Sequence, residues 1–182
     1  MNAYPTALPD VVVIEPTAYE DDRGVFFESY NSREFARAIG RSVQFVQDNH
    51  SRSRHMVLRG LHYQLPNPQG KLVRVTRGTI WDVAVDLRRS SPTYGQWVGE
   101  MLSAENRRQM WIPEGFAHGF VVLSEEADCL YKVTEYRCPE AERALAWNDP
   151  RLKIAWPLGA ERPVLSARDM AADAWGTAVT YE

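Results

Sequence analysis

Several features that would assign a protein class are scarce in this chain of 182 residues. It has only two cysteines, Cys129 and Cys138, without the close spacing of a metal or redox motif, so we expect reduced thiols in a cytoplasmic protein. No stretch approaches the roughly 18 consecutive apolar residues of a transmembrane helix. The first residues have neither the positive start nor the apolar run of a signal peptide, so none is expected.

Concentrated positive charge is also missing. The net charge is −3 at pH 7, and there is no basic run or arginine-rich helix, so a nucleic-acid partner is not expected. Hydrophobic residues make up 45% of the chain, which is enough to form a buried core. Because no repeat, low-complexity tract or linker divides the sequence, we expect one domain over residues 1–182.

The dominant pattern in the sequence has a period of two residues. In "TIWDVAVDLRR", the odd-numbered residues from Trp81 to Leu87 are apolar. Asp82 and Asp86 have the other parity, so we expect a strand with one face in a core. By similar patterns, strands are also expected over residues 11–15, 25–30, 43–49, 59–64, 71–77, 119–124, 129–136 and 144–149.

Helix signals are few. Asn31 is a candidate N-cap for a helix that stops at Gly40, and Ser166 is a candidate N-cap for a second helix with Asp169 in its first turn. Many short strands combined with few helices predict an all-β sandwich or barrel with small helices at its edges.

Some polar residues share a strand face with apolar ones. Gln47 and Asn49 have the parity of Phe45, and His62 shares a face with Gln64. A buried polar group costs about 1–3 kcal/mol for each hydrogen bond that it fails to make. For any one of these residues, a hydrogen-bonded place in the core is a sufficient explanation. Several together favour a ligand pocket in the mouth of a small barrel.

Four cations lie near strand starts and turns: Arg23, Arg59, Lys71 and Arg74. Each one alone is consistent with a solvated face. Together they suit phosphate recognition, because arginine offers a forked set of donors and lysine a compact charge. Cations kept in a cleft of an acidic chain would steer an anionic small molecule to that cleft.

The segment "PEGFAHGF" (113–120) is similar to the second motif of the cupins, in which Pro-x-Gly-x-x-His returns a histidine to a barrel strand. Metal-binding cupins take further ligands from a His-x-His pair and a later glutamate. Here His62 is followed by Tyr63 and Gln64, so the pair is broken. We therefore expect no catalytic metal, which favours a base over a metal ligand for His62.

A longer series of motifs resembles one family. The segments are "DDRGVFFESYN", "FVQDNHSRS", "LRGLHYQ", "QGKLVR", "WDVAVDLRRSSPTYGQW", "MWIPEGFAHGFVVLSE", "LYK" and "WNDP". They are similar to the dTDP-4-dehydrorhamnose 3,5-epimerases, the metal-free cupins of dTDP-L-rhamnose synthesis, over nearly the whole chain. The resemblance implies a double-stranded β-helix (cupin jelly roll) with a few short peripheral helices, a homodimer and no cofactor. It also implies inversion of carbons 3 and 5 of dTDP-4-dehydro-6-deoxy-D-glucose, giving dTDP-4-dehydro-L-rhamnose.

The resemblance also implies the catalytic residues. Both carbons lie next to a ketone, so their inversion needs a base, an acid on the opposite face and a stabilised enolate. By resemblance, His62 is the base and Asp169 the partner that fixes its tautomer. Tyr131 matches the opposite acid. Lys71 matches a lysine beside the sugar ketone, where a cation stabilises the enolate.

Nine further residues match nucleotide-sugar contacts of the family: Arg23, Phe26, Glu28, Gln47, Asn49, Arg59, His118, Glu142 and Arg168. Other interpretations stay open for four of them. Phe26 also suits a core position, Glu28 and Glu142 suit surface charges, and His118 also suits a place behind the direct contacts.

One position departs from the family's pattern, because Arg137 follows Tyr136 where a second aromatic residue is usual. A guanidinium stacks on a base, so binding can survive, but the change can also alter substrate choice or the extent of inversion. Three alternative functions stay open. They are a single-position epimerase of a related dTDP-4-keto-6-deoxy sugar, a metal-dependent cupin enzyme and a non-catalytic nucleotide-sugar binder.

Overall fold

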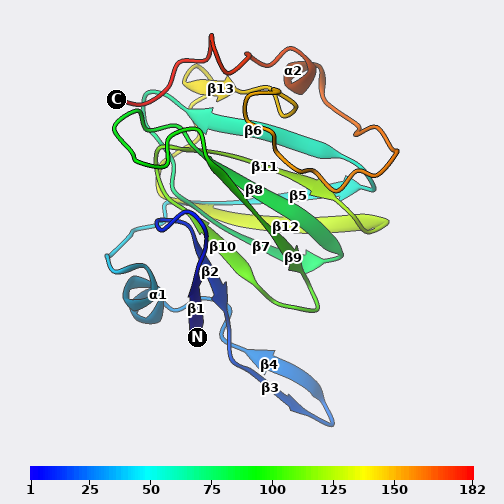
Figure 1. Ribbon diagram of the computed structural model, residues 1–182. Coiled ribbons are helices and arrows are strands. Elements are labelled where there is room, and N and C mark those ends of the chain that lie inside the picture. Colours follow the sequence, from blue (N-terminus) through cyan, green and yellow to red (C-terminus); the bar gives the residue numbers. More distant parts are fainter.

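The computed structural model describes residues 1–182 and consists mainly of strands (Figure 1). The strands are β1 (Asn2–Pro5), β2 (Val12–Glu15), β3 (Ala18–Asp21), β4 (Gly24–Phe27), β5 (Gln47–Arg54), β6 (Leu58–Gln64), β7 (Lys71–Arg77), β8 (Thr79–Asp86), β9 (Trp97–Ser103), β10 (Gln109–Ile112), β11 (Phe116–Val122), β12 (Glu126–Val133) and β13 (Glu142–Ala144). The two helices are α1 (Ser32–Ile39) and α2 (Ala167–Met170). The predicted all-β fold with small peripheral helices is confirmed.

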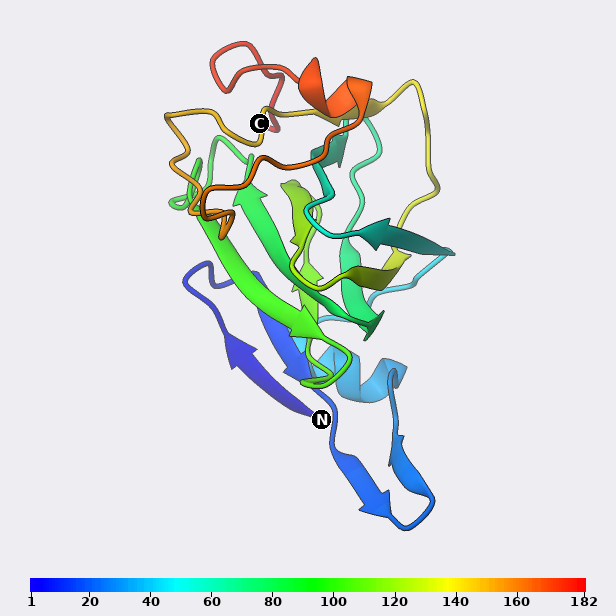
Figure 2. The same ribbon diagram turned by 90° about the vertical axis from the view of Figure 1, so that its right-hand side faces the viewer.

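Two antiparallel sheets form the body of the molecule. The six-stranded sheet has the order β1-β2-β10-β7-β12-β5, and the five-stranded sheet has the order β13-β6-β11-β8-β9. Side chains from both sheets fill the core between them, such as Val73 and Cys129 from the first and Ala84 and Phe120 from the second. The hairpin β3–β4 forms a separate two-stranded sheet that projects from the body (Figures 1 and 2).

Strand β8 is buried on both faces, which differs from the single core face that its alternation predicts. Ala84 faces the core between the sheets. Val83 and Val85 pack instead into a second cluster with Leu145 and Leu152. The long segment after β13 covers the outer face of the five-stranded sheet, and this cover explains the second buried face.

The strand expected over 43–49 begins only at Gln47. Phe45 precedes it and packs with Phe35 of α1 and Trp111 of β10, at ring-centroid distances of 5.4 and 6.1 Å. The expectation that Phe45 shares a strand face with Gln47 was therefore wrong, because the aromatic cluster beneath α1 takes its side chain. The strand expected over 144–149 was also wrong in its extent, since β13 ends at Ala144.

Both predicted N-caps are confirmed. The Asn31 side chain accepts hydrogen bonds from the first backbone amides of α1, and Gly40 ends that helix with a φ of 74°. Ser166 Oγ accepts a hydrogen bond from the Asp169 amide at 3.1 Å and so caps α2, which is a single turn. Neither helix has the length and apolar character needed to cross a membrane.

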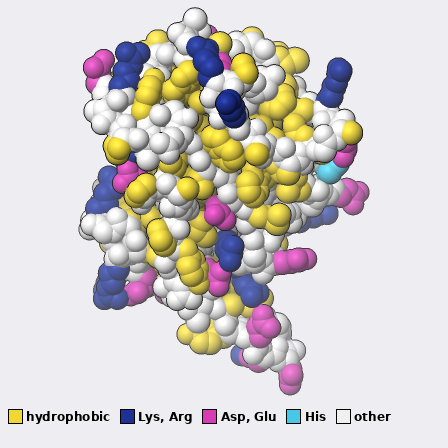
Figure 3. Space-filling view, viewed as in Figure 1, with side chains coloured by type: hydrophobic (Ala, Val, Ile, Leu, Met, Phe, Trp, Pro, Cys, Tyr) yellow, Lys and Arg dark blue, Asp and Glu magenta, His cyan; other side chains and the backbone are white.

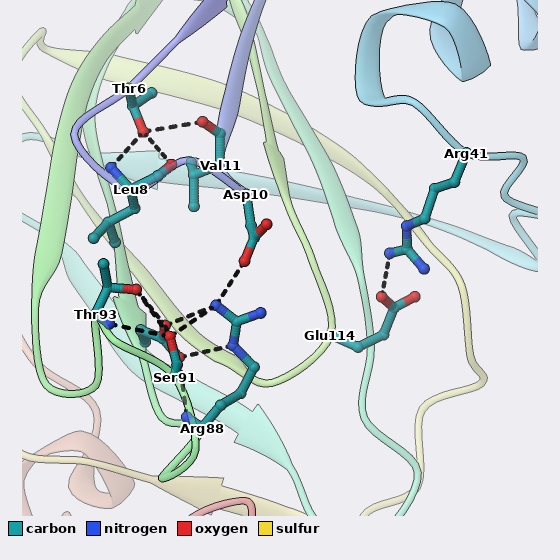
Figure 4. A network of polar contacts seen from close by, with 10 residues as sticks. Thr6, Leu8, Asp10, Val11, Arg41, Arg88, Ser91, Thr93 and Glu114 are labelled. Carbon is teal, nitrogen blue, oxygen red and sulfur yellow. Dashed lines mark hydrogen bonds and ion pairs between the residues drawn. The ribbon is translucent and has the colours of Figure 1, made fainter.

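An ion-pair network attaches the N-terminal segment to one end of the body (Figure 4). Arg88 lies between two carboxylates, at 2.8 Å from Asp10 and 2.7 Å from Asp86. Asp86 is completely buried and also accepts hydrogen bonds from Ser91 and Thr93. Burial alone raises the pKa of Asp86, but the hydrogen bonds from Arg88, Ser91 and Thr93 outweigh it and lower the pKa to about 2.

The surface differs between the body and the hairpin. Figure 3 shows hydrophobic side chains gathered over the body and acidic side chains near the hairpin tip. Two aromatic residues of the hairpin are nevertheless largely exposed, Tyr19 at 66% and Phe26 at 72%. Large exposed apolar side chains on a projecting element mark it as a candidate contact surface.

Candidate active site

A polar cavity of about 220 Å³ opens between the two sheets. Its walls come from β5, β6, β7, β11, β12 and β13, together with the segment after β12 and helix α2. Its lining residues are Gln47, Asn49, Ser51, Arg59, His62, Tyr63, Gln64, Gln69, Lys71, His118, Phe120, Tyr131, Arg137, Glu142 and Arg168. Nine of the predicted site residues therefore lie in this lining, and Asp169 lies directly behind His62.

His62 and Asp169 form a hydrogen-bonded pair on the cavity wall. The distance between His62 Nε2 and Asp169 Oδ1 is 2.6 Å. The histidine side chain is 40% exposed, whereas the aspartate side chain is 3% exposed. Ser166 Oγ donates to the other carboxylate oxygen at 2.8 Å. Burial raises the pKa of Asp169, but the hydrogen bonds from His62 and Ser166 outweigh it and hold the pKa below its usual value.

Two glycines allow strands β6 and β11 to approach each other closely. Gly60 on β6 has a φ of 123°, and a Cβ placed there would lie 2.6 Å from the Cα of Gly119 on β11. Only glycine fits this approach. Two residues further along β6, His62 is paired in register with His118 of β11. The two histidines therefore lie side by side on the same sheet.

His118 has its own buried carboxylate. Its Nε2 lies 2.6 Å from Asp82 Oδ1, and Asp82 is completely buried. The second oxygen of Asp82 has no hydrogen-bond partner. Burial raises the pKa of Asp82, although the nearby His118 opposes this shift. Sequence reasoning missed this pair, and the only signal for it was an aspartate in the apolar strand β8.

Lys71 lies deep in the cavity with 6% of its surface exposed. Its ammonium group donates to the backbone carbonyl of His62 at 3.3 Å. Burial lowers the pKa of Lys71 to about 8, although the charges of Asp82 and Glu142 oppose the shift. The lysine therefore remains mostly protonated at neutral pH and places a positive charge beside the His62 strand.

Tyr131 lies on β12, in the sheet opposite to the one that carries His62. Its ring packs against the core between the sheets, and the same residue lines the cavity. Burial raises the pKa of the Tyr131 phenol, so the hydroxyl keeps its proton at neutral pH. A histidine and a protonated tyrosine therefore reach the cavity from opposite sheets.

The remaining lining residues include amides and arginines. Gln47 Nε2 donates to Asn49 Oδ1 at 2.7 Å, and Arg59 Nε donates to Ser53 Oγ at 3.0 Å. Arg168 and Arg137 both form ion pairs with Glu142 at the cavity mouth. Sequence reasoning identified Arg137 only as a departure from a family pattern and did not foresee this contact.

Gln64, the residue at the broken His-x-His position, supports a loop. Its side chain donates to the carbonyls of Asn67 and Tyr136 and accepts from the Cys138 amide at 2.8 Å. No group of three or more His, Cys, Asp or Glu side chains in the structure is placed to hold a metal ion.

Three predicted contacts lie away from the cavity of the same chain. Arg23 is at the tip of the projecting hairpin and pairs with Asp21 at 2.5 Å. Phe26 lies on the hairpin strand β4 and is 72% exposed, which also rules out a core position within this chain. Glu28 follows that strand and accepts a hydrogen bond from Asn31.

Comparison with known proteins assigns the chain to a family. The family model described as dTDP-4-dehydrorhamnose 3,5-epimerase matches residues 5–176. The chain belongs to the dTDP-4-dehydrorhamnose 3,5-epimerase family. It is 63% identical over 178 residues to the dTDP-4-dehydrorhamnose 3,5-epimerase of Pseudomonas aeruginosa, with 98% of each chain covered.

Solved structures agree with this assignment. The fold matches a dTDP-6-deoxy-D-glucose-3,5-epimerase from Legionella pneumophila in complex with dTDP-4-keto-L-rhamnose, with a TM-score of 0.94, 50% identity and coverage of 98% and 94% of the two chains. It also matches a 3′-monoepimerase from Streptomyces bikiniensis in complex with dTDP-quinovose, with a TM-score of 0.89, 32% identity and coverage of 96% and 88%. The solved structures that resemble this chain therefore include one named as a 3,5-epimerase and one named as a 3′-monoepimerase.

Proposed function

We propose that this protein inverts carbons 3 and 5 of dTDP-4-dehydro-6-deoxy-D-glucose and forms dTDP-4-dehydro-L-rhamnose. Membership of the 3,5-epimerase family supports the reaction. The observation that carries the mechanism is the placement of a histidine and a protonated tyrosine on opposite sheets of one cavity. Inversion of a carbon requires a proton to leave from one face and to return from the other.

In the proposed mechanism, His62 removes the proton next to the ketone. The anionic Asp169, held 2.6 Å from the imidazole, stabilises the imidazolium that forms. The enolate oxygen would carry negative charge, and the cationic Lys71 in the cavity lining is suited to stabilise it. Tyr131 would return a proton to the opposite face and so complete the inversion.

The nucleotide end of the substrate would lie toward the arginines. Arg59 and Arg168 are the predicted cationic contacts, and Gln47 and Asn49 are the predicted polar ones. A dTDP-sugar carries a diphosphate, and the forked donors of arginine suit its oxygens. His118 and Glu142 complete the set of proposed contacts within this chain.

We also propose a homodimer in which the hairpin of one subunit completes the cavity of its partner. The hairpin projects from the body (Figure 2), and its Tyr19 and Phe26 side chains are largely exposed. A partner's hairpin would bring Arg23, Phe26 and Glu28 to the cavity, which would explain why they lie away from it within one chain.

We also infer that the protein works in the cytoplasm, an inference that the free thiols of Cys129 and Cys138 support.

Subunit complementation tests the dimer. We expect H62N and R23A to be nearly inactive when each is purified alone. When the two variants are mixed and allowed to exchange subunits, one cavity of each mixed dimer has an intact His62 and an intact hairpin. Activity should then recover toward about a quarter of the wild-type value. No recovery in mixed dimers, with subunit exchange demonstrated, would exclude the shared site.

Proton NMR in heavy water, with the substrate and a chelator present, tests the reaction itself. Loss of the signals at both carbons 3 and 5 is the expected result. Loss at one carbon alone would identify the single-position alternative, which the likeness to the 3′-monoepimerase and the presence of Arg137 keep in view. Activity that the chelator abolishes would indicate the metal-dependent alternative, and substrate binding without any exchange would indicate the binder.

A further inference from the structure

Ser166 makes two hydrogen bonds with one residue behind the cavity wall. Its Oγ accepts from the Asp169 backbone amide at 3.1 Å, and this contact caps α2. The same Oγ donates to Asp169 Oδ2 at 2.8 Å. The other carboxylate oxygen, Oδ1, lies 2.6 Å from His62 Nε2. The carboxylate is therefore held from two sides, by the serine on one oxygen and by the histidine on the other.

The orientation of the Asp169 carboxylate depends on the contact with the serine. The torsion that turns an aspartate carboxylate is broad and roughly two-fold, so the backbone alone does not fix it. The hydroxyl on Oδ2 limits this rotation and keeps Oδ1 directed at His62. Burial raises the pKa of Asp169, but the hydrogen bonds from His62 and Ser166 outweigh it, so the carboxylate stays charged at neutral pH.

The backbone on both sides of α2 is tied to the sheet that carries His62. Before the helix, the Val164 carbonyl accepts from the Leu58 amide at the start of β6, at 3.0 Å. After the helix, the Asp173 carbonyl accepts from the Ala146 amide, just beyond β13, at 2.8 Å. These contacts hold the segment independently of the cap, so α2 should stay in place when the serine hydroxyl is removed.

The buried histidine–carboxylate pair lacks a residue of this kind. His118 Nε2 also lies 2.6 Å from an aspartate oxygen, but the second oxygen of that aspartate, Asp82, has no hydrogen-bond partner. A second donor on the carboxylate is thus present in the pair that reaches the cavity and absent from the pair beneath it. This difference suggests that the serine serves the chemistry of the exposed pair.

We propose that Ser166 is a positioning residue for the proton transfer at His62. It acts through Asp169, because it holds the carboxylate in the orientation that faces the imidazole. Ser166 itself lies outside the cavity lining and has no contact with the substrate in this proposal. The inference rests on the proposed function, since it takes His62 as the base, and it adds a residue that the proposed mechanism did not include.

Steady-state kinetics with dTDP-4-dehydro-6-deoxy-D-glucose test the role of the hydroxyl. S166A should lower kcat about tenfold, on the scale of one hydrogen bond to a charged group. Because α2 stays anchored, KM should remain within about twofold of the wild-type value. S166G should lose as much kcat as S166A, although glycine is almost as good an N-cap as serine. S166T keeps a hydroxyl that caps and donates, so its kcat should lie within about threefold of the wild type.

A double-mutant cycle with D169A separates positioning from a structural role. If the serine acts through the carboxylate, S166A/D169A should have the kcat of D169A within about twofold. If the serine acts only as the cap of α2, the two losses should multiply, because the amide of residue 169 is still present in D169A.

The matched control is S103A. Ser103 Oγ also accepts from the backbone amide three residues later, that of Asn106, at 2.9 Å, but it lies outside the cavity lining. Its replacement removes the same type of contact and should leave kcat and KM unchanged. Melting temperatures of all variants show whether each one is folded.

Four results would overturn the proposal. They are an unchanged kcat in folded S166A, a KM that rises as much as kcat falls, a kcat of S166T as low as that of S166A, and losses that multiply in S166A/D169A. Wild-type protein that exchanges no substrate protons in heavy water would refute the proposed reaction and, with it, the role of Ser166. Normal exchange by the wild type together with an unchanged kcat in S166A would refute the role of Ser166 alone.

Discussion

Two histidine–carboxylate pairs lie on adjacent strands and differ mainly in their surroundings. The Nε2–Oδ1 distance is 2.6 Å in both pairs. His62 exposes 40% of its side chain toward the cavity, and both oxygens of Asp169 have partners. His118 exposes only 8%, and one oxygen of Asp82 has none. The short hydrogen bond is therefore common to both pairs, and the exposure of the histidine to the cavity is what distinguishes the proposed base.

The largest expected effect comes from removing the exposed histidine. H62N should lower kcat by about 10³-fold, the range for loss of a general base, while the melting temperature changes little. H118N should lower kcat by less than about tenfold, because the proposed mechanism gives His118 a contact with the substrate and no proton transfer. Steady-state kinetics on both variants check this, and equal losses in kcat would remove the distinction between the two pairs.

Replacing the carboxylate behind each histidine should reproduce the difference between the two pairs, with smaller losses of kcat. D169N removes the charge that stabilises the His62 imidazolium, which corresponds to about 3 kcal/mol or about a hundredfold in kcat. D82N should reduce kcat only a few-fold, because it acts through the orientation of His118. A D82N variant that loses as much activity as D169N would place the buried pair in the proton path.

The alkaline side of the pH profile tests the role of the Lys71 charge. Lys71 has a pKa of about 8, so it loses its charge above that pH and kcat should fall about tenfold per unit. K71R should have lower activity but no alkaline limb, since arginine stays protonated. An unchanged alkaline limb in K71R would assign that titration to another group.

Local patterns in the sequence predicted part of this site. The alternation in "RGLHYQ" correctly paired His62 with Gln64, which both line the cavity, and Leu61 with Tyr63, which both pack in one hydrophobic cluster, although Tyr63 also borders the cavity. Parity within one strand depends on neighbouring residues only. The caps at Asn31 and Ser166 were predictable for the same reason. Assignment of the catalytic roles came from the family resemblance and still awaits a test.

Long-range arrangements were not predictable from local patterns. The contact between Asp82 and His118 joins residues 36 positions apart and depends on the pairing of β8 with β11. The position of Phe45 outside strand β5 depends on how α1 packs against the six-stranded sheet. The second buried face of β8 depends on the segment after β13, which carries little regular secondary structure and therefore no period that reveals where it lies.

The smallest expected effect concerns stability. The pH dependence of the stability contribution has opposite signs for Asp169 and Asp82. The folded pKa of Asp169 is lowered, so its contribution to stability is present above the unfolded pKa and is lost as the pH falls through the folded value. The folded pKa of Asp82 is raised, so its contribution is present below the unfolded pKa and is lost as the pH rises through the folded value. At pH 7, D169N should therefore cost on the order of 1 kcal/mol in the free energy of unfolding, and D82N should cost less. Urea unfolding at pH 7 and at a pH well below the ordinary aspartate pKa of about 3.9 measures both, and the D169N deficit should shrink at the lower pH. A larger loss for D82N than for D169N at pH 7 would mean that the ionised Asp82 stabilises the fold despite its unpaired oxygen.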